Sequence, residues 1–367
     1  MDQSTGSEGA LEATSEVVTG VVVTLPGTGL SPLAVAAVAK GTAASTKRAY
    51  EKDWRQFRVW CGQNGREFLP ATAETLTEYT AYLCYQVIPG GEIHEHLAAG
   101  GRRGLSLSSV NRALSAIAVK HREENLDPPS RDGDKEANAI LRGYKAHLAL
   151  TKDSRATPRQ APAMTPEKLQ RVRDTPSTRL KELRDRALVL LGFGLGARIS
   201  ELVLLDVEDV EQPSQGLLVS VYRQKTRKHD KVKIPRAYAP GIVEGVQAWI
   251  SALAEAGYTT GPLFPRIDRH GNLGSCGGGR KDGSPDGRMT ADAAGRTFRA
   301  AMRQGGPGER WTAHSLRRGM ATEARKNGHD QITIAKQGGW APNSASMLGY
   351  MEDGDGWINN ALKGMDL

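Results

Sequence analysis

The chain has 367 residues and a formal net charge of +8, a length that allows two domains with a core each. Its three cysteines, Cys61, Cys84 and Cys276, exclude a disulfide framework or a zinc site with paired ligands, and they indicate a reducing compartment. The apolar stretch at residues 17–25 is too short for a membrane-spanning helix and follows acids instead of the basic start of a signal peptide. We therefore expect a cytoplasmic protein.

The positive charge lies beyond residue 44, because acidic side chains outnumber the single lysine in residues 1–44. A basic body of this kind suits a polyanion, with nucleic acid as the first candidate and an anionic membrane surface as the second. Charge alone does not decide between them, since it also serves solubility.

Residues 1–44 are rich in Gly, Ala, Ser, Thr and Val, and we expect them to form a disordered tail. Residues 45–150 are predicted to form a compact helical domain. Apolar side chains recur there at helical spacing in four places: Tyr50, Trp54, Phe57 and Cys61; Leu76, Tyr79 and Leu83; Val110, Leu114 and Ile117; Ile140, Leu141, Tyr144 and Leu148.

Residues 151–163 contain two prolines and few large apolar side chains, a composition typical of an extended linker. A second domain, 164–367, is predicted to open with Thr165 and Pro166 at a helix start. Helices are expected there at about 166–173, 178–193, 240–256, 290–303, 315–327 and 331–337, with a further one after Arg198 and a β-hairpin at 217–222 and 231–235. The predicted fold is mainly α, with a small β-hairpin in an α+β second domain.

The glycine-rich stretch 266–289 could suggest a phosphate-binding loop. The chain contains no Gly-Lys dipeptide, so the P-loop signature is absent. We expect a flexible surface insertion here.

Two motifs place cations near turns of the second domain. Arg198 stands where a glycine-rich turn meets a helix, a position that disfavours a cation unless an anion binds there. Glu201 follows one turn later, either as a simple N-terminal acid or as a group that orients the arginine. Lys225 lies on the turn of the hairpin among other basic residues, which could be a solvated charged turn or a set of phosphate contacts.

Two further motifs lie towards the C-terminal end. His314 and Arg317 are three residues apart on one predicted helix and face the same side. A histidine that exchanges a proton beside an arginine that grips a phosphate suits phosphoryl transfer, although a capping histidine and an ion-paired arginine would look the same. Trp340 and Tyr350 follow, and burial in a core is the ordinary explanation for such a tyrosine.

Taken in order, these residues resemble the active-site set of the tyrosine recombinase (phage integrase) family: Arg198, Lys225, His314, Arg317, Trp340 and Tyr350. The motifs are G-x-R-x-S-E-L at 196–202, the H-x-x-R pair and the Trp…Tyr ending. The resemblance covers about 164–352 and, by layout alone, 45–150. One departure is that ten residues separate Trp340 from Tyr350, one more than in the family pattern.

The resemblance implies a site-specific recombinase or integrase that cleaves and rejoins DNA strands through a covalent 3′-phosphotyrosine, without metal, nucleotide or other cofactor. Tyr350 would be the nucleophile, with Arg198 and Arg317 holding the non-bridging oxygens. His314 would accept the phenolic proton, and Trp340 would donate a hydrogen bond.

In the same scheme Lys225 would protonate the leaving 5′-oxygen and Glu201 would support the arginine or the histidine. Further cations are candidates for DNA contacts: Lys47, Arg48, Arg223, Arg227, Lys228 and Lys231.

The family resemblance also implies partners. These are double-stranded DNA recombination sites, held in a two-domain clamp, and three further copies of the chain in a homotetramer on DNA; an accessory directionality factor is compatible with this scheme. The apolar face of the C-terminal tail could dock on a neighbouring protomer or on its own domain: Trp357, Ile358, Ala361 and Leu362. Two other functions stay open, a type IB-like topoisomerase and a DNA-binding protein that no longer cleaves.

Overall fold

The computed structural model describes residues 44–86, 104–129, 134–157, 160–176, 178–274, 286–303, 310–341 and 343–356, together with Leu362 and Met365. Contacts between Cα atoms divide the chain into two compact units, Met1–Arg159 and Gln160–Leu367. Most of the predicted tail, the middle of the glycine-rich stretch and most of the predicted C-terminal face lie outside the described residues.

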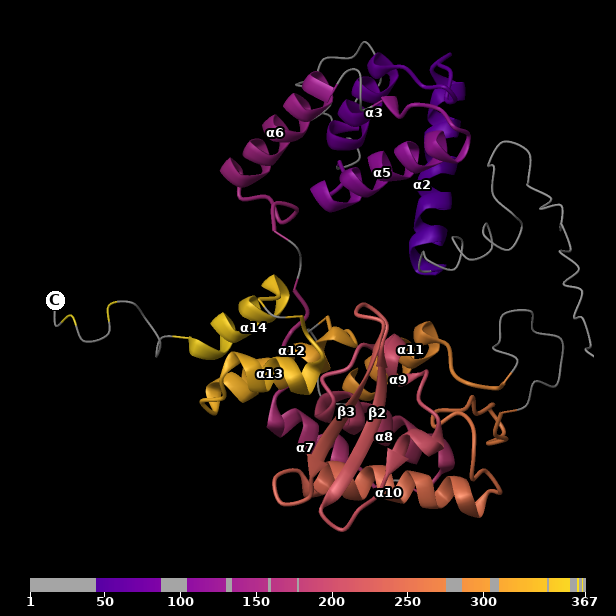
Figure 1. Ribbon diagram of the computed structural model, residues 1–367, viewed down its shortest axis with the longest axis vertical. Coiled ribbons are helices and arrows are strands. Elements are labelled where there is room, and N and C mark those ends of the chain that lie inside the picture. The colour runs from indigo at the N-terminus through magenta and orange to yellow at the C-terminus, as the bar shows by residue number, and fades with distance from the viewer. Residues whose placement is uncertain are drawn as a thin grey trace, which may run out of the picture. The chain divides into compact units, whose positions relative to one another are not determined.

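The first unit contains the four helices that hydrophobic spacing predicted (Figure 1): α2 (Ala44–Gln63), α3 (Ala73–Tyr85), α5 (Leu107–Glu123) and α6 (Asp134–Leu150). Their periodic apolar residues meet in one core. Five large members of this core are at most 1% exposed: Phe57, Tyr79, Ile117, Tyr144 and Leu148. The buried His121 joins α5 to the start of α3, since Nε2 accepts from the Ala71 N–H at 2.9 Å while Nδ1 lies 2.8 Å from the Ile117 carbonyl.

Both ends of the predicted linker 151–163 pack on folded structure. Arg155 donates to the Gly104 carbonyl at 2.9 Å and to the Tyr144 hydroxyl at 3.2 Å, so residues 151–157 belong to the first unit. The Ala161 carbonyl accepts from Arg318 at 2.6 Å within the second unit. The connection between the units is therefore shorter than the predicted linker.

The second unit is mainly helical with a small sheet. Its helices are α7 (Pro166–Asp174), α8 (Leu180–Gly194), α9 (Ile199–Leu202), α10 (Pro240–Glu255), α11 (Ala291–Arg303), α12 (His314–Lys326), α13 (Gln331–Gly338) and α14 (Ala345–Asp355), with a 3-10 turn, η2 (Val207–Asp209). The strands are β1 (Val210–Glu211), β2 (Gly216–Arg223) and β3 (Lys228–Pro235). This arrangement confirms the predicted fold class, although β1 was not predicted.

The sheet is antiparallel, with strand order β1-β2-β3. Alternate residues of β2 face the core, as the period of two requires: Leu217, Val219, Val221 and Arg223 are all buried. The first three are apolar, and the fourth is an arginine. The core face of the strand therefore ends in a charge.

Two apolar clusters form the interior of the second unit. The larger one surrounds α8, which packs against α7, α10, α11 and α12. The smaller one lies between α12, α13 and α14, where Met320, Ile334, Met347 and Met351 pack around Trp340. This second cluster positions the C-terminal motif. None of the described helices is both long and apolar enough to span a membrane.

Candidate active site

The turn between α8 and α9 fixes Arg198 and Glu201. Gly196 in this turn has a φ of 51°, and a Cβ atom there would lie 2.3 Å from Cε of Met320, so the turn requires glycine. Glu201 reaches back to the Arg198 backbone N–H at 3.1 Å, and its other oxygen accepts from Nη1 of Arg198 at 2.6 Å. The carboxylate is fully buried, whereas the arginine side chain is 24% exposed. Glu201 thus orients Arg198 towards solvent.

Arg317, on α12, has a buried guanidinium in an unusual setting. Its Nη1 donates to the carbonyl oxygens of Gly196 and Gly338, and its Cζ lies 3.6 Å from the ring centroid of Trp340, a cation–π contact. Its Nη2 is also buried and has no hydrogen-bond partner among the described residues. Because burying a donor without an acceptor is costly, this nitrogen is suited to bind an anion.

Burial and neighbouring positive charge lower the pKa of two groups in the site, Arg317 and His314. Burial and then the charge of Arg198 lower the pKa of Arg317 to about 9, a value at which the guanidinium stays protonated at neutral pH. Burial and then the charges of Arg317 and Arg198 lower the pKa of His314 below its ordinary 6.5. The imidazole is therefore neutral at neutral pH, beside two positive charges that an anion would stabilise.

Trp340 and Tyr350 lie edge to face, with ring centroids 6.3 Å apart and an interplanar angle of 71°. The ten-residue spacing thus still brings the two rings together. A negative charge on Tyr350 would raise the pKa of Arg317, so the phenol is within electrostatic reach of that guanidinium.

The helix that carries Tyr350 is held on α12 of the same chain. The Tyr350 carbonyl accepts from the Thr322 hydroxyl at 3.0 Å. Two ion pairs, both 2.6 Å long, also join α12 to α14: Arg318–Asp353 and Arg325–Asp355. None of these contacts was predicted, because they depend on how two helices pack rather than on a motif.

Lys225 lies on the turn between β2 and β3 and is exposed. Among the contacts of the described residues, none joins Lys225 to the arginines. Arg227, Lys228 and Lys231 are exposed on the same hairpin, as expected for candidate DNA contacts. Lys231 pairs with Glu211 at 3.2 Å.

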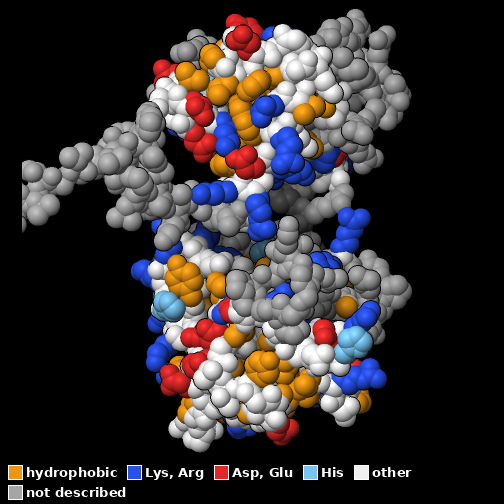
Figure 2. Space-filling model, turned by 90° about the vertical axis from the view of Figure 1, so that its right-hand side faces the viewer, with side chains coloured by type: hydrophobic (Ala, Val, Ile, Leu, Met, Phe, Trp, Pro, Cys, Tyr) orange, Lys and Arg blue, Asp and Glu red, His pale blue; other side chains and the backbone are white. Residues whose placement is uncertain are grey.

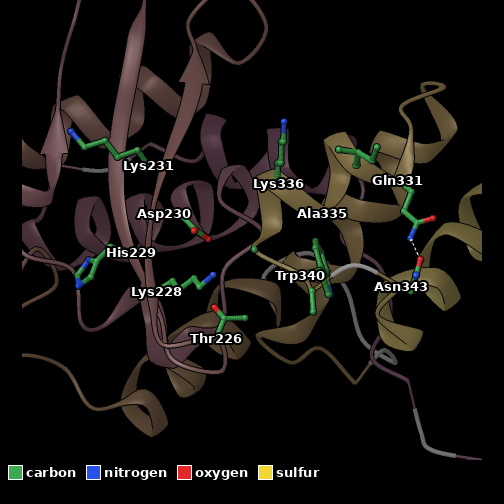
Figure 3. A pocket seen from close by; sticks show the side chains of 13 residues that line it. Thr226, Lys228, His229, Asp230, Lys231, Gln331, Ala335, Lys336, Trp340 and Asn343 are labelled. Carbon is green, nitrogen blue, oxygen red and sulfur yellow. Dashed lines mark hydrogen bonds between the residues drawn. The ribbon is translucent and has the colours of Figure 1, made fainter.

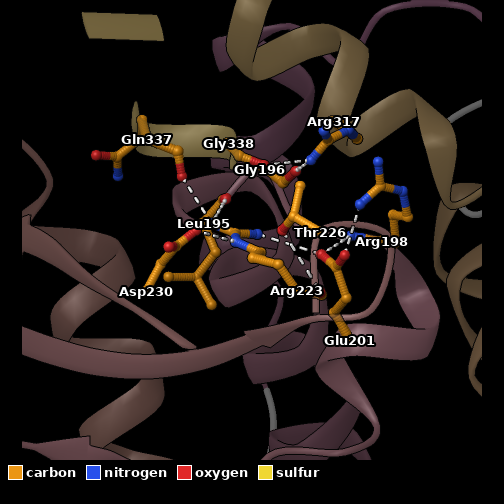
Figure 4. Close-up of polar contacts among 10 residues, drawn as sticks. All are labelled: Leu195, Gly196, Arg198, Glu201, Arg223, Thr226, Asp230, Arg317, Gln337 and Gly338. Atoms are coloured by element: carbon orange, nitrogen blue, oxygen red, sulfur yellow. Dashed lines mark hydrogen bonds and ion pairs between the residues drawn. The ribbon is translucent and has the colours of Figure 1, made fainter. Parts of the chain in front are cut away.

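Arg223 corrects one sequence-based prediction. It was expected to contact DNA from the surface, but its side chain is 0% exposed. Its guanidinium donates to Glu201 at 3.2 Å and to Asp230 at 3.3 Å (Figure 4). The strand alternation that buries Val219 and Val221 also directs Arg223 inwards, a signal that the sequence already contained.

A depression of about 1030 Å³ lies between the hairpin and α13 (Figure 3). Lys228 and Lys231 line it from β3, Lys336 lines it from α13, and Trp340 is a further lining residue. Within the described ranges, no group of His, Cys, Asp or Glu side chains could hold a metal ion.

The first unit presents further cations, and Lys and Arg side chains are visible on both units in Figure 2. Lys47 and Arg48 are exposed on the first turns of α2. Lys52 and Arg55 are exposed on the same face as Arg48, at spacings of four and seven residues. Lys52 and Arg55 were not predicted as DNA contacts, although their helical spacing from Arg48 is visible in the sequence.

A profile described as "Phage integrase family" matches residues 162–352 of the chain, which is more than half of its length. The chain belongs to the phage integrase family. This confirms the family predicted from the sequence and, with it, the predicted class of enzyme, a site-specific recombinase of the tyrosine type.

Two relatives can be aligned with most of the length of this chain. The integrase/recombinase XerD homolog of Selenomonas ruminantium is 27% identical, over 89% of this chain and 86% of that protein. Recombinase Cre of Escherichia phage P1 is 23% identical, over 82% and 86%. The Tn1549 transposon integrase, solved in complex with transposon right end DNA, has a similar fold, with a TM-score of 0.50 at 15% identity over 86% of this chain and 92% of that one.

Proposed function

We propose that this recombinase cleaves DNA through attack of Tyr350 on a phosphate held by Arg198 and Arg317. The observation that carries the proposal is the buried Arg317 guanidinium, which keeps one nitrogen without a partner among the described residues. The same guanidinium stacks on Trp340, whose ring meets Tyr350. An anion bound by this arginine would therefore lie close to the phenol.

The charges of the site favour a phosphate over a neutral ligand. Arg198, Arg223 and Arg317 are clustered, and the one fully buried carboxylate among them belongs to Glu201. Guanidinium groups match phosphate oxygens in pairs and keep their charge. Their donors can stabilise the negative charge that gathers on the non-bridging oxygens in the transition state.

The bond changes balance without a cofactor. The Tyr350 oxygen forms a bond to phosphorus, and the bond from phosphorus to the 5′-oxygen breaks, leaving a 3′-phosphotyrosine and a 5′-hydroxyl. His314, neutral because its pKa is lowered, accepts the phenolic proton. Lys225 donates a proton to the 5′-oxygen from the exposed hairpin turn. Attack by a 5′-hydroxyl of another strand then reverses these steps and exchanges the strands.

The partner in this proposal is double-stranded DNA at recombination sites, with four copies of the chain acting together. Exposed Arg48, Lys52 and Arg55 on α2 support a DNA contact by the helical domain, 45–150. The basic depression beside β3 supports a second contact by the catalytic domain, 164–367. The chain between Arg155 and Ala161 would connect the two domains across the duplex.

Covalent capture on nicked duplexes tests the proposal. A pool with a randomised central sequence and a nick near the cleavage position traps any covalent adduct, because the short cleaved fragment diffuses away. The wild-type protein should give an adduct that survives denaturing electrophoresis, and Tyr350→Phe should give none. Tyr238→Phe is the matched control, since Tyr238 is 89% exposed and lies in the same unit; it should react like wild type.

Two copies of the captured sequence on one plasmid then distinguish the alternatives. Exchange between the copies is the expected result. Relaxation of supercoils without exchange would indicate a topoisomerase, and binding without any adduct would indicate a protein that no longer cleaves. The first result would overturn strand exchange but not cleavage by Tyr350, and the second would overturn both.

A further inference from the structure

Arg223 differs from the two other arginines of the cluster, Arg198 and Arg317, because neither its burial nor its contacts suit a DNA ligand. We infer that Arg223 is a positioning residue, which sets the places of Arg198, Lys225 and Arg317 without touching the substrate. The inference deepens the proposed function and rests on it.

All three nitrogens of the Arg223 guanidinium donate hydrogen bonds. It is one of the largest fully buried side chains among the described residues, and it ends the core face of β2. Its nitrogens donate to four acceptors on four separate segments: Glu201 at 3.2 Å, Asp230 at 3.3 Å, the Gln337 carbonyl at 3.0 Å and the Leu195 carbonyl at 3.5 Å. Each of these segments carries or adjoins a residue of the proposed site.

Arg223 and Arg317 bind neighbouring backbone carbonyl groups at two places in the chain (Figure 4). In each pair the first carbonyl accepts from Arg223 and the second from Arg317: Leu195 and Gly196 after α8, and Gln337 and Gly338 at the end of α13. The carbonyl end of a helix favours cations, so both arginines also suit the end of α13. Moving Arg223 would shift the carbonyls that orient Arg317 and its free nitrogen.

The buried carboxylate of Glu201 is shared between two arginines. One oxygen accepts from Arg198 at 2.6 Å and the other from Arg223 at 3.2 Å. Because Arg223 occupies the second oxygen, Glu201 is not available to bind both ends of the Arg198 fork. Arg198 therefore keeps donors that can point to a phosphate.

Arg223 also contacts the hairpin, through its backbone at the turn and through its side chain on β3. The Arg223 carbonyl accepts from the Arg227 N–H at 2.7 Å, across the turn that carries Lys225. Asp230, on β3, pairs with Nε of Arg223. On the other side, a Cβ atom at Gly339 would lie 2.3 Å from this Nε, so the backbone just before Trp340 packs directly on the arginine.

The test compares two nicked substrates built on the captured sequence. One has the natural bridging 5′-oxygen at the cleaved bond, and the other has a 5′-sulfur, whose thiolate leaves without needing a proton. Lys225→Ala should lose much of its rate on the oxygen substrate and little on the sulfur substrate. Arg223→Lys, which keeps the charge but not the fork, should lose about 10- to 100-fold on oxygen, the size expected for a misplacement of about 1 Å. Its loss on sulfur should be smaller.

Arg184→Lys is the matched control. Arg184 is also buried, at 3% exposure, and donates to Asp185 and to the Pro265 carbonyl, outside the cluster. The same substitution there should lower the melting temperature and leave the sulfur-to-oxygen rate ratio as in wild type. The ratio therefore separates positioning of Lys225 from a general loss of stability.

Each outcome decides the matter. If wild type forms no adduct, the proposed function fails and this inference with it. If wild type reacts but Lys225→Ala shows no sulfur effect, or Arg223→Lys keeps the wild-type ratio, Arg223 does not position Lys225, while cleavage by Tyr350 stands. If Arg223→Lys also reacts on oxygen as fast as Arg184→Lys, the positioning of Arg198 and Arg317 is wrong as well. Should Arg223→Lys not fold, Asp230→Asn replaces it, because Asp230 is 37% exposed; a smaller rise of the ratio is then expected, and an unchanged ratio overturns the positioning of Lys225.

Discussion

His314 lies beside two arginines, and burial together with their charges lowers its pKa below the ordinary value of 6.5. A base works only when it is neutral, so adduct formation should rise with pH through this pKa and then level off. At subsaturating protein, where the profile reports the free enzyme, we expect its acidic limb to lie below pH 6.5. In Arg198→Gln the whole profile should be lower, and its limb should move to higher pH because one positive charge is gone. A limb at or above pH 6.5 in wild type would contradict the assignment.

The sequence alone predicted some residues of the proposed site correctly and others not. Arg198, His314 and Arg317 stand in short local motifs, and the structure brings them together. Arg223 was misread because a charge near a basic turn was expected to face solvent, whereas strand alternation directs it inwards. One of its partners, the Gln337 carbonyl, lies 114 residues away, so no local pattern could have named it.

The helix α14 carries Tyr350, and its packing on α12 is tightest at Gly354. A Cβ atom there would lie 2.6 Å from the Thr322 carbonyl oxygen, so Gly354→Ala should push the two helices apart. Overpacking of this kind costs about 1–3 kcal/mol. We expect a lower melting temperature and slower adduct formation, because Tyr350 moves with its helix.

Gly349→Ala is the control on the same helix, since nothing lies within 4 Å of its Cβ position. Alanine favours a helix over glycine by about 1 kcal/mol, so this variant should melt at the same or a higher temperature. If both variants form the adduct equally fast, close docking of α14 on α12 is not what positions the tyrosine.

Among the elements, helices were predicted better than strands. The four helices of the first unit follow from their apolar spacing, which their common core confirms. The strand β3 begins at Lys228, three residues before the predicted start, because its first residues are polar and give no apolar alternation in the sequence. The strand β1, only two residues long, gives no pattern in the sequence.

At the scale of the whole chain, the two units have separate cores. The core of the first unit contains no residue beyond Ala156, and the cores of the second begin at Met164. The cations of α2 and the arginine cluster therefore belong to different folding units. Changes to one set should leave the structure of the other intact.

This separation predicts that DNA affinity and cleavage can be altered independently. In the full-length chain, Arg48→Ala/Lys52→Ala/Arg55→Ala removes three exposed cations from one face of α2. Each lost phosphate contact lowers the slope of log binding constant against log salt by about 0.9, so three should lower it by about 2.7. Adduct formation at saturating protein should keep its wild-type rate. Arg58→Ala removes a cation whose guanidinium is held over the Phe68 ring, and it should leave the slope unchanged; an equal effect of both variants would show that Arg48, Lys52 and Arg55 are not the DNA contact.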